Sequence, residues 1–429
     1  MLENDRKKHC FAVFFFLKEL TFYTKYDKIK FRKYYGLHSE KKMSRKSVAV
    51  LDVRSSQVTA VIGEAGVNRT FIFRGSYTQE YSGYDEEGFI DEEDFASAVL
   101  SAVAEVEHRS MEKIKEIVVG VPGDFIELLT KRYLISLQSG RKITAGDIAT
   151  LYQNGLKDKV DGGEVIRRSN MYFITSDKRR IINPVGLRSD SLEGFLCYFV
   201  CKDYFMRTLD KILLGYGIRK VTYMPISYAE AMYLIDSEAR DGYAVLLDVD
   251  SLSHTFSVVC GNGILYQRSA CEGGDHIAAR LYERFSVPYY AMKDMLSKIN
   301  LSGRDIPGTE VETYYERQLY KIDAERLRTA IKEELDILCE RINAYLEECP
   351  ERTISYRPIL MTGGGLSYIR GAQEHISKRL NKVVEVLSPS LPYYSKESQS
   401  SLLSVLDMAI KDKQKGSIVY KILNGFGGN

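Results

Sequence analysis

Short apolar runs rich in β-branched residues occur in two widely separated parts of the chain. The first run, 48–51, ends at Asp52 and is followed by strand-like runs at 58–62 and 70–73. The second run, 243–247, ends at Asp248 and is followed by runs at 255–259 and 264–266. Turn residues separate the runs, so each region predicts a three-strand meander.

The first strands of the two meanders end in matching pentamers. One reads Leu51-Asp52-Val53-Arg54-Ser55 and the other reads Leu247-Asp248-Val249-Asp250-Ser251. Because the same order of elements surrounds both pentamers, the pattern indicates two related halves rather than an array of short repeats.

Helical periodicity appears directly after the first meander. Asp91 can cap a helix whose apolar residues from Phe95 to Val106 recur on one face. A buried strand over 114–121 follows, and a strand after a helix favours a mixed α/β sheet with helical cover. Residues 124–204 differ from this pattern: strands at 125–137, 171–174 and 194–201 and a helix near 145–156 predict a compact α+β insertion.

The second half is richer in helices. Residues 275–350 are mainly helical, a strand at 358–361 leads into Thr362-Gly363-Gly364-Gly365, and the last helix is expected near 398–411. With 429 residues, 45% of them hydrophobic and 28% charged, the chain is expected to fold as about three domains' worth of globular protein. A collagen-like or wholly disordered chain is excluded.

The charge balance argues against nucleic acid as a partner, because the formal net charge is only +2. Residues 1–42 hold a basic excess, and we expect residues 1–45 to be a disordered extension or a wrongly assigned start, with Met43 as the alternative first residue. The seven Cys show no C-x-x-C pair, which argues against a zinc site or a disulfide framework. The longest apolar run near the start, 11–17, is too short to span a membrane.

Asp52 and Asp248 are candidate ligands of a nucleotide-bound magnesium ion. Two strand-end carboxylates that approach one cleft can hold the water shell of the metal while the adjacent turns face phosphates. The alternative that both residues only cap turns stays open. Gly273-Gly274 and Gly363-Gly364-Gly365 are further candidates, because residues without a Cβ let the backbone approach a ligand closely.

The doubled meander and both glycine loops resemble the actin-like ATPase superfamily. Two further segments are similar to the bacterial cell-division protein family FtsA: Asn183-Pro184-Val185-Gly186-Leu187, and Ile143-Thr144-Ala145-Gly146-Asp147-Ile148 before the helix of the insertion. The resemblance covers roughly residues 46–426.

The resemblance implies an α/β, actin-like (ribonuclease H-like) fold of two lobes with an FtsA-type inserted α+β subdomain. The expected division is as follows: lobe 1 core at 46–123 and 205–230, inserted subdomain at 124–204, lobe 2 core at 231–289 and 350–390, helical subdomain of lobe 2 at 290–349, C-terminal helix packed on lobe 1 at 391–412, and a membrane-targeting tail at 413–429.

The resemblance also implies an adaptor at the division site. Such a protein binds ATP with Mg²⁺ between its lobes, self-associates into filaments and binds the C-terminal tail of the tubulin-like FtsZ. It contacts other division proteins through the inserted subdomain and lies peripherally on the inner face of the cytoplasmic membrane. No nucleic acid is expected as a partner.

Two departures from the family pattern predict a degenerate phosphate site. Arg54 stands at a glycine position of the first phosphate loop, followed by Ser55 and Ser56, and the second loop from Asp248 to Ser253 lacks its glycines. Side chains there obstruct contact between backbone and phosphate, and Asp250 adds repulsion that Arg54 offsets in part. ATP binding is therefore expected to be weak or altered, and no catalytic residue is assigned. The candidate cofactor-binding residues are Asp52, Arg54, Ser55, Ser56, Asp248, Gly273, Gly274, Gly363, Gly364 and Gly365.

The chain ends in an amphipathic pattern. One helical face would carry Ile418, Val419, Ile422, Leu423 and Phe426, with several lysines nearby for anionic headgroups. The alternative is that these residues pack on the protein's own surface.

Two other functions remain open at this point. One is a pilus-assembly scaffold of the same fold, which would neither bind vesicles alone nor recognise FtsZ. The other is an ATP-dependent enzyme of the same superfamily, such as a kinase, against which the altered phosphate loops argue.

Overall fold

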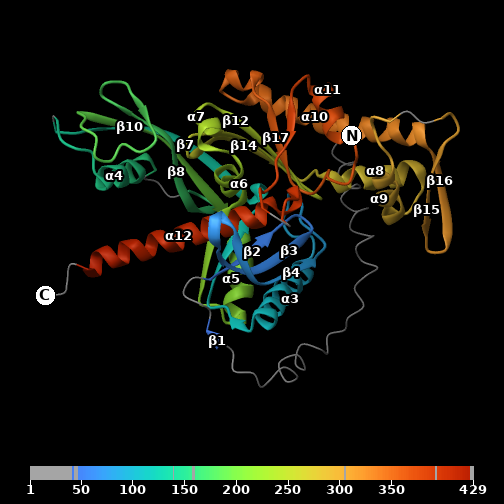
Figure 1. Ribbon diagram of the computed structural model, residues 1–429, viewed down its shortest axis with the longest axis horizontal. Coiled ribbons are helices and arrows are strands. Elements are labelled where there is room, and N and C mark those ends of the chain that lie inside the picture. The colour runs from blue at the N-terminus through green and yellow to red at the C-terminus, as the bar shows by residue number, and fades with distance from the viewer. Residues whose placement is uncertain are drawn as a thin grey trace.

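Two five-stranded sheets form the centres of two lobes, and a smaller sheet projects from their side (Figure 1). The computed structural model describes residues 41–42, 47–138, 140–156, 160–303, 306–391 and 394–425. Of the expected N-terminal extension, only Lys41 and Lys42 are described, as the short strand β1 (Lys41–Lys42).

The sheet of lobe 1 has the order β11-β6-β2-β3-β4. Its strands are β2 (Val48–Val53), β3 (Gln57–Ala65), β4 (Phe71–Glu80), β6 (Glu116–Val121) and β11 (Lys220–Pro225). Strands β2, β3 and β4 form the predicted antiparallel meander, and β6 lies parallel to both β2 and β11. Strand β4 is longer than predicted because its alternating exposed residues pair along β3.

Helix α3 (Glu92–Ser110) covers the lobe 1 sheet as the periodicity predicted. The carboxylate of Asp91 caps it by accepting hydrogen bonds from the backbone N–H groups of Glu93 and Asp94. The apolar face from Phe95 to Val106 is buried. Around this lobe lie β5 (Glu112–Lys113), α5 (Asp203–Tyr216) and α6 (Ile226–Leu234), and the short helix α7 (Ser237–Asp241) that follows packs on β13 of lobe 2.

The sheet of lobe 2 repeats the arrangement, with the order β14-β13-β12-β17-β18. Its strands are β12 (Ala244–Val249), β13 (His254–Cys260), β14 (Gly263–Ala270), β17 (Ile359–Thr362) and β18 (Val384–Val386). Here too an antiparallel meander is followed by parallel strands. The outer part of the lobe contains α8 (Gly274–Phe285), α9 (Tyr289–Lys298), β15 (Glu310–Tyr315), β16 (Gln318–Asp323), α10 (Ala324–Glu348) and α11 (Ala372–Leu380).

The projecting sheet has the order β7-β10-β8-β9. Its elements are β7 (Ile126–Ser136), α4 (Ala145–Gly155), β8 (Gly163–Thr175), β9 (Arg180–Ile181) and β10 (Ser191–Lys202). Thr144 and Asp147 form a capping box at the start of α4, and a separate cluster of buried residues includes Leu151 and Tyr198. Strand β8 begins earlier than predicted, because residues of low hydrophobicity are held there by pairing with β10.

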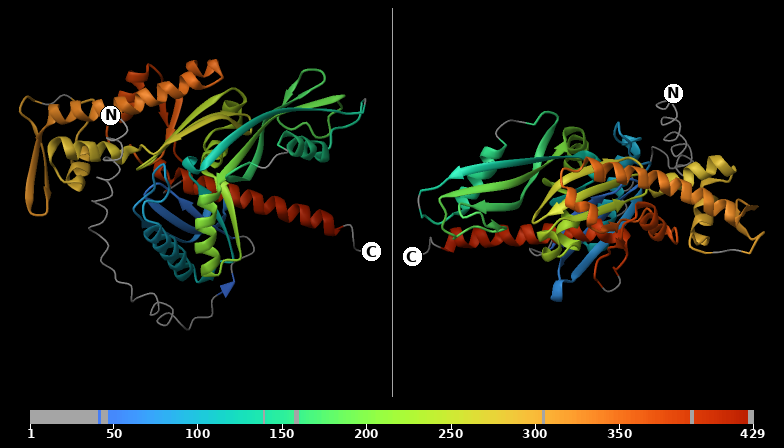
Figure 2. Two further views of the ribbon diagram at one scale, coloured as in Figure 1. Left: turned by 180° about the vertical axis from the view of Figure 1, so that it is seen from behind. Right: turned by 90° about the horizontal axis from the view of Figure 1, so that it is seen from above.

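Helix α12 (Ser400–Gly425) begins between the lobes and continues past the body beneath the inserted subdomain (Figures 1 and 2). The predicted last helix at 398–411 was therefore too short, since no helix break separates it from the tail. Asp412 forms an ion pair with Arg167 of β8, and Lys413 Nζ donates a hydrogen bond to the carbonyl of Ser47 at 2.6 Å. Among the helices of the described ranges, none is long and apolar enough to cross a membrane.

Candidate functional site

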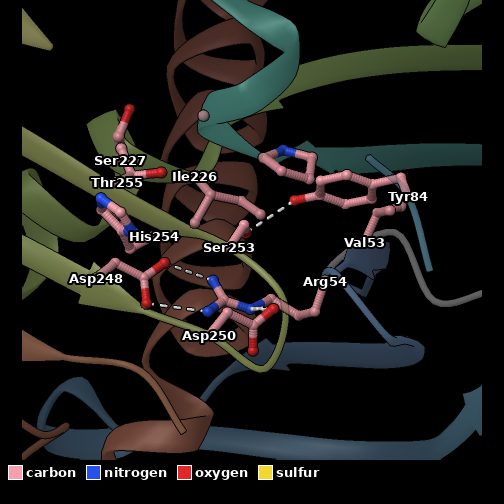
Figure 3. A pocket seen from close by; sticks show the side chains of 12 residues that line it. Val53, Arg54, Tyr84, Ile226, Ser227, Asp248, Asp250, Ser253, His254 and Thr255 are labelled. Atoms are coloured by element: carbon pink, nitrogen blue, oxygen red, sulfur yellow. Dashed lines mark hydrogen bonds and ion pairs between the residues drawn. The ribbon is translucent and has the colours of Figure 1, made fainter. Parts of the chain in front are cut away.

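The loops that follow β2 and β12 meet between the two lobes (Figure 3). The repeated pentamers end these two strands, so the fourth residue of each, Arg54 and Asp250, enters the same small space. Asp248, at the carboxyl end of β12, faces the guanidinium of Arg54.

Arg54 joins two carboxylates of the opposite lobe. Its Nη1 and Nη2 donate to the two carboxylate oxygens of Asp248 at 2.7 and 2.9 Å, and its Nε lies 3.2 Å from Oδ2 of Asp250. All three residues are buried. Burial alone would lower the pKa of Arg54, but Asp248 and Asp250 raise that pKa well above its ordinary value, so the guanidinium stays charged.

Ser55 completes the contact from the lobe 1 side. Its backbone N–H and its hydroxyl both donate to Oδ2 of Asp250, each at 2.7 Å, and its Oγ accepts from the backbone N–H of Leu252 at 2.9 Å. Burial raises the pKa of Asp250, but Arg54 and the two Ser55 donors outweigh that effect and lower it below the ordinary value. Asp250 is therefore an ionised, fully engaged carboxylate.

Asp52 has a different environment from its counterpart Asp248. Its Oδ2 accepts a hydrogen bond from the hydroxyl of Ser401 on α12 at 2.6 Å, and within the described part of the chain Oδ1 has no partner. Burial raises the pKa of Asp52 to about 6, although Arg54 and Ser401 lower it.

Glu230 of α6 adds a further buried carboxyl near this site. It is fully buried, and neither of its side-chain oxygens has a partner among the described residues. Burial, followed by the charge of Asp248, raises the pKa of Glu230 well above its ordinary value. Sequence reasoning missed this residue, although a lone acidic residue among the apolar side chains of α6 was an available signal.

The glycine loops press against the backbone of the second phosphate loop. The N–H groups of Gly365 and Gly274 donate to the carbonyls of Val249 and Asp250, both at 2.9 Å. A Cβ on Gly365 would lie 2.1 Å from the carbonyl oxygen of Asp250. Gly273 and Gly363 are equally close to this loop, whereas Gly364 faces Ser398. Close packing therefore explains why a residue without a Cβ stands at each of these positions except Gly364. Contact between the glycine loops and a nucleotide stays a prediction.

The space left between the two loops is about 10 Å³, lined in part by Arg54, Asp248 and Asp250 (Figure 3). That volume holds one water molecule at most, whereas ligand pockets measure on the order of 300 Å³ or more. Both oxygens of Asp248 bind Arg54, and the donors of Ser55 bind Asp250. Residues in this arrangement do not fit a magnesium ion with a nucleotide phosphate. Ser56 lies beside the cluster, where its carbonyl accepts a hydrogen bond from Tyr81.

His254 is buried at the start of β13, beside the altered loop 248–253. Its Nδ1 lies 2.6 Å from the carbonyl oxygen of Glu272 and its Nε2 lies 3.3 Å from the hydroxyl of Tyr345. Burial lowers the pKa of His254. Its environment is that of a satisfied core residue.

The proposed membrane residues are only partly described. The backbone of Ile418, Val419, Ile422 and Leu423 is helical within α12, and their side chains lie outside the described part of the structure. Phe426 lies outside the described residues altogether.

Comparison with known proteins gives similarities in sequence and in fold, while no protein-family model matches the chain. FtsA of Streptococcus pneumoniae serotype 2 (strain D39 / NCTC 7466) is 21% identical over 325 residues, which cover 75% of this chain and 69% of that protein. FtsA of Helicobacter pylori (strain ATCC 700392 / 26695) is 22% identical over 160 residues, 36% of this chain and 32% of that protein.

Two solved structures share the overall fold. A PilM–PilN type IV pilus biogenesis complex matches with a TM-score of 0.59 and 12% identity, over 86% of this chain and 99% of the other. MreB5 of Spiroplasma citri bound to ADP matches with a TM-score of 0.53 and 9% identity, over 87% of this chain and 98% of the other. The chain is thus an actin-like α/β protein related in sequence to the FtsA cell-division proteins, as its motifs predicted.

Proposed function

We propose that the protein is an FtsA-like adaptor of bacterial cell division that tethers FtsZ filaments to the inner face of the cytoplasmic membrane. The observation that carries the proposal is the sequence similarity to FtsA over 75% of the chain. The inserted subdomain, with its own sheet and core, supplies a separate surface for other division proteins.

The C-terminal helix supports the membrane part of the proposal. Helix α12 extends to Gly425, and on a helix the spacing of Ile418, Val419, Ile422 and Leu423 brings them to one face. Lys415 and Lys421 supply positive charge for anionic lipids. A single short helix of this kind binds a membrane only marginally, so self-association of the protein would strengthen attachment by multiplying the anchors.

The partner at the division site is proposed to be the C-terminal tail of FtsZ. ATP binding is proposed to be weak at most, because Arg54 and Asp250 occupy the place where phosphate would meet the loops. Since no catalytic group is assigned, the proposed role is that of a scaffold.

The test is vesicle co-sedimentation of the full chain with purified FtsZ, using vesicles that contain anionic lipid. The variant Ile422→Asp/Phe426→Asp removes the apolar face, and Gln414→Asp/Asn424→Asp adds the same charge at polar positions of the same helix. FtsZ should pellet with the wild type and with the control variant but not with the apolar-face variant. The proposal fails if FtsZ stays in the supernatant with all three.

A pilus-type scaffold is the second candidate, favoured by the structural similarity to the PilM–PilN complex. Such a protein would bind a short peptide of a membrane partner and would leave both FtsZ and vesicles unbound. This candidate would be favoured if the full chain neither sediments with vesicles nor retains an FtsZ tail peptide in a pull-down.

A further inference from the structure

We propose that the cleft between the lobes contains a built-in substitute for a metal-bound phosphate. The Arg54 guanidinium takes the place of the cation, and the Asp250 carboxylate takes the place of the phosphate. The lobes are thereby held closed without any nucleotide. This inference does not depend on the proposed adaptor role, because it concerns only the contacts between the two lobes.

Asp250 occupies an anion site formed by the other lobe. The turn after β2 presents two donors, the backbone N–H and the hydroxyl of Ser55, and both are directed at Oδ2 of Asp250 at 2.7 Å. Backbone N–H groups in turns are typical binding sites for phosphate oxygens. A phosphate would need the same two donors, so it would have to displace a carboxylate that is covalently part of the protein.

Arg54 supplies the positive charge that two facing carboxylates require. Its guanidinium binds both oxygens of Asp248 and lies within ion-pair distance of Asp250. Paired N–H donors of a guanidinium match a carboxylate geometrically, which makes such a contact both strong and directional. Both carboxylate oxygens of Asp248 are thus already bound to a cation that belongs to the protein.

The contacts cross between the lobes and use groups that a ligand would need. Ser55 of lobe 1 also accepts from the N–H of Leu252 in lobe 2, and the hydroxyls of Tyr84 and Ser253 lie 3.1 Å apart. In lobe 2 the N–H groups of Gly274 and Gly365 are bonded to the loop 249–251. Because every partner belongs to the same chain, a free nucleotide would have to compete with an intramolecular contact.

The test combines nucleotide titration with hydrogen exchange on the full chain. The wild type is titrated with a fluorescent ATP analogue and Mg²⁺, and exchange is followed in the segments 53–57 and 250–253 with and without MgATP. We expect no saturable binding up to about 1 mM and no change in exchange on adding MgATP. Saturable binding below about 1 mM, or exchange slowed several-fold by MgATP, would overturn the proposal.

Variants test whether Arg54 holds the cleft. Arg54→Ala should raise exchange in both segments by about tenfold or more, since each tenfold corresponds to about 1.4 kcal/mol of lost protection. Arg207→Ala is the matched control, because Arg207 pairs with Asp203 on the exposed side of α5, in the same lobe but away from the cleft. If Arg54→Ala does not fold, Arg54→Lys takes its place, since it keeps the charge but cannot make both bonds, and should show an intermediate increase. Exchange equal to the wild type in the folded Arg54 variant contradicts the proposal.

Discussion

The ends of β2 and β12 have closely similar sequences but opposite electrostatic roles. Asp52 and Asp248 occupy the same position in the two pentamers, yet Asp52 meets a serine hydroxyl and Asp248 meets a guanidinium. Two residues later the side chains carry opposite charges, with Arg54 in lobe 1 and Asp250 in lobe 2. The difference shows that two related halves can become complementary to each other, so that one strand end supplies the cation and the other supplies the anions.

The strongest way to break this complementarity is Arg54→Ala. It leaves Asp248 and Asp250 buried without their cation, and breaking a buried pair in this way costs about 3–5 kcal/mol. Urea unfolding of the full chain measures the loss as a lower midpoint. Arg207→Ala should change the free energy of unfolding by less than about 1 kcal/mol, because Arg207 and its partner Asp203 are both exposed. Equal losses in both variants would contradict the contrast between the cleft and the surface pair.

The comparison of the two aspartates is sharpened by Asp52→Asn and Asp248→Asn. The folded state raises the pKa of Asp52 from 3.8 to about 6, so ionising Asp52 opposes folding. That cost is absent below pH 3.8, grows as the pH rises to about 6, and is complete above it. Asp52→Asn should therefore stabilise the protein at pH 8, by up to about 3 kcal/mol, with little effect near pH 4.

Asp248→Asn should instead destabilise the protein at pH 8, because it removes a charge-assisted pair with Arg54 at a cost of about 1.5–3 kcal/mol. Thermal or urea unfolding at pH 4 and pH 8 follows Asp52→Asn, and unfolding at pH 8 compares the two variants. The charged and polar groups that interact with Asp52 are Arg54, Asp248, Asp250, Glu230 and Ser401, and both variants leave four of them or more in place. If Asp52→Asn also destabilises the protein at pH 8, the two aspartates do not differ as described.

The packing of the lobe 2 loop is tested by Gly365→Ala against Gly364→Ala. A Cβ at Gly365 would lie 2.1 Å from the carbonyl oxygen of Asp250, so the loop that carries Asp250 must move, at a cost of about 1–3 kcal/mol. At Gly364 the nearest atom is the Cβ of Ser398 at 3.0 Å, which gives way more easily than backbone. The unfolding midpoint of Gly365→Ala should be well below that of Gly364→Ala. The reverse order would contradict this packing.

The smallest expected effect belongs to Ser401→Ala. The hydroxyl of Ser401 lowers the pKa of Asp52, so its loss should raise that pKa above about 6 and cost about 1 kcal/mol at pH 8. Carboxyl chemical shifts followed against pH would report the change directly. An unchanged titration of Asp52 would show that the contact with α12 contributes nothing to its state.

Much of the fold could be predicted from local patterns. The periodicity from Phe95 to Val106 located α3, and the alternating runs located both meanders. The extension of β8 could not be predicted, because pairing with β10 is not encoded in local hydrophobicity. The last helix and the tail follow two separate helical patterns in the sequence, whereas the structure joins them in the single helix α12.

The candidate site was located by sequence but not explained by it. The altered loops at Arg54 and at 248–253 indicated a degenerate phosphate site, and Asp250 was expected to repel phosphate with Arg54 offsetting part of its charge. The structure shows that Arg54 pairs with Asp250 and also with Asp248, and the second pairing was not predicted. Glu230 and Ser401 were missed because neither lies near the loops in the sequence.

The sequence by itself determined the order of the elements, the two matching strand ends and the opposite charges at Arg54 and Asp250. Those properties depend on residues a few positions apart, where periodicity and propensity act. Only the tertiary structure decided which charges meet, since Arg54 and Asp248 are 194 positions apart and Asp52 and Ser401 are 349 apart. The energy of a buried charge depends on its partners and on its distance from water, and both are set by how the two lobes and α12 pack together.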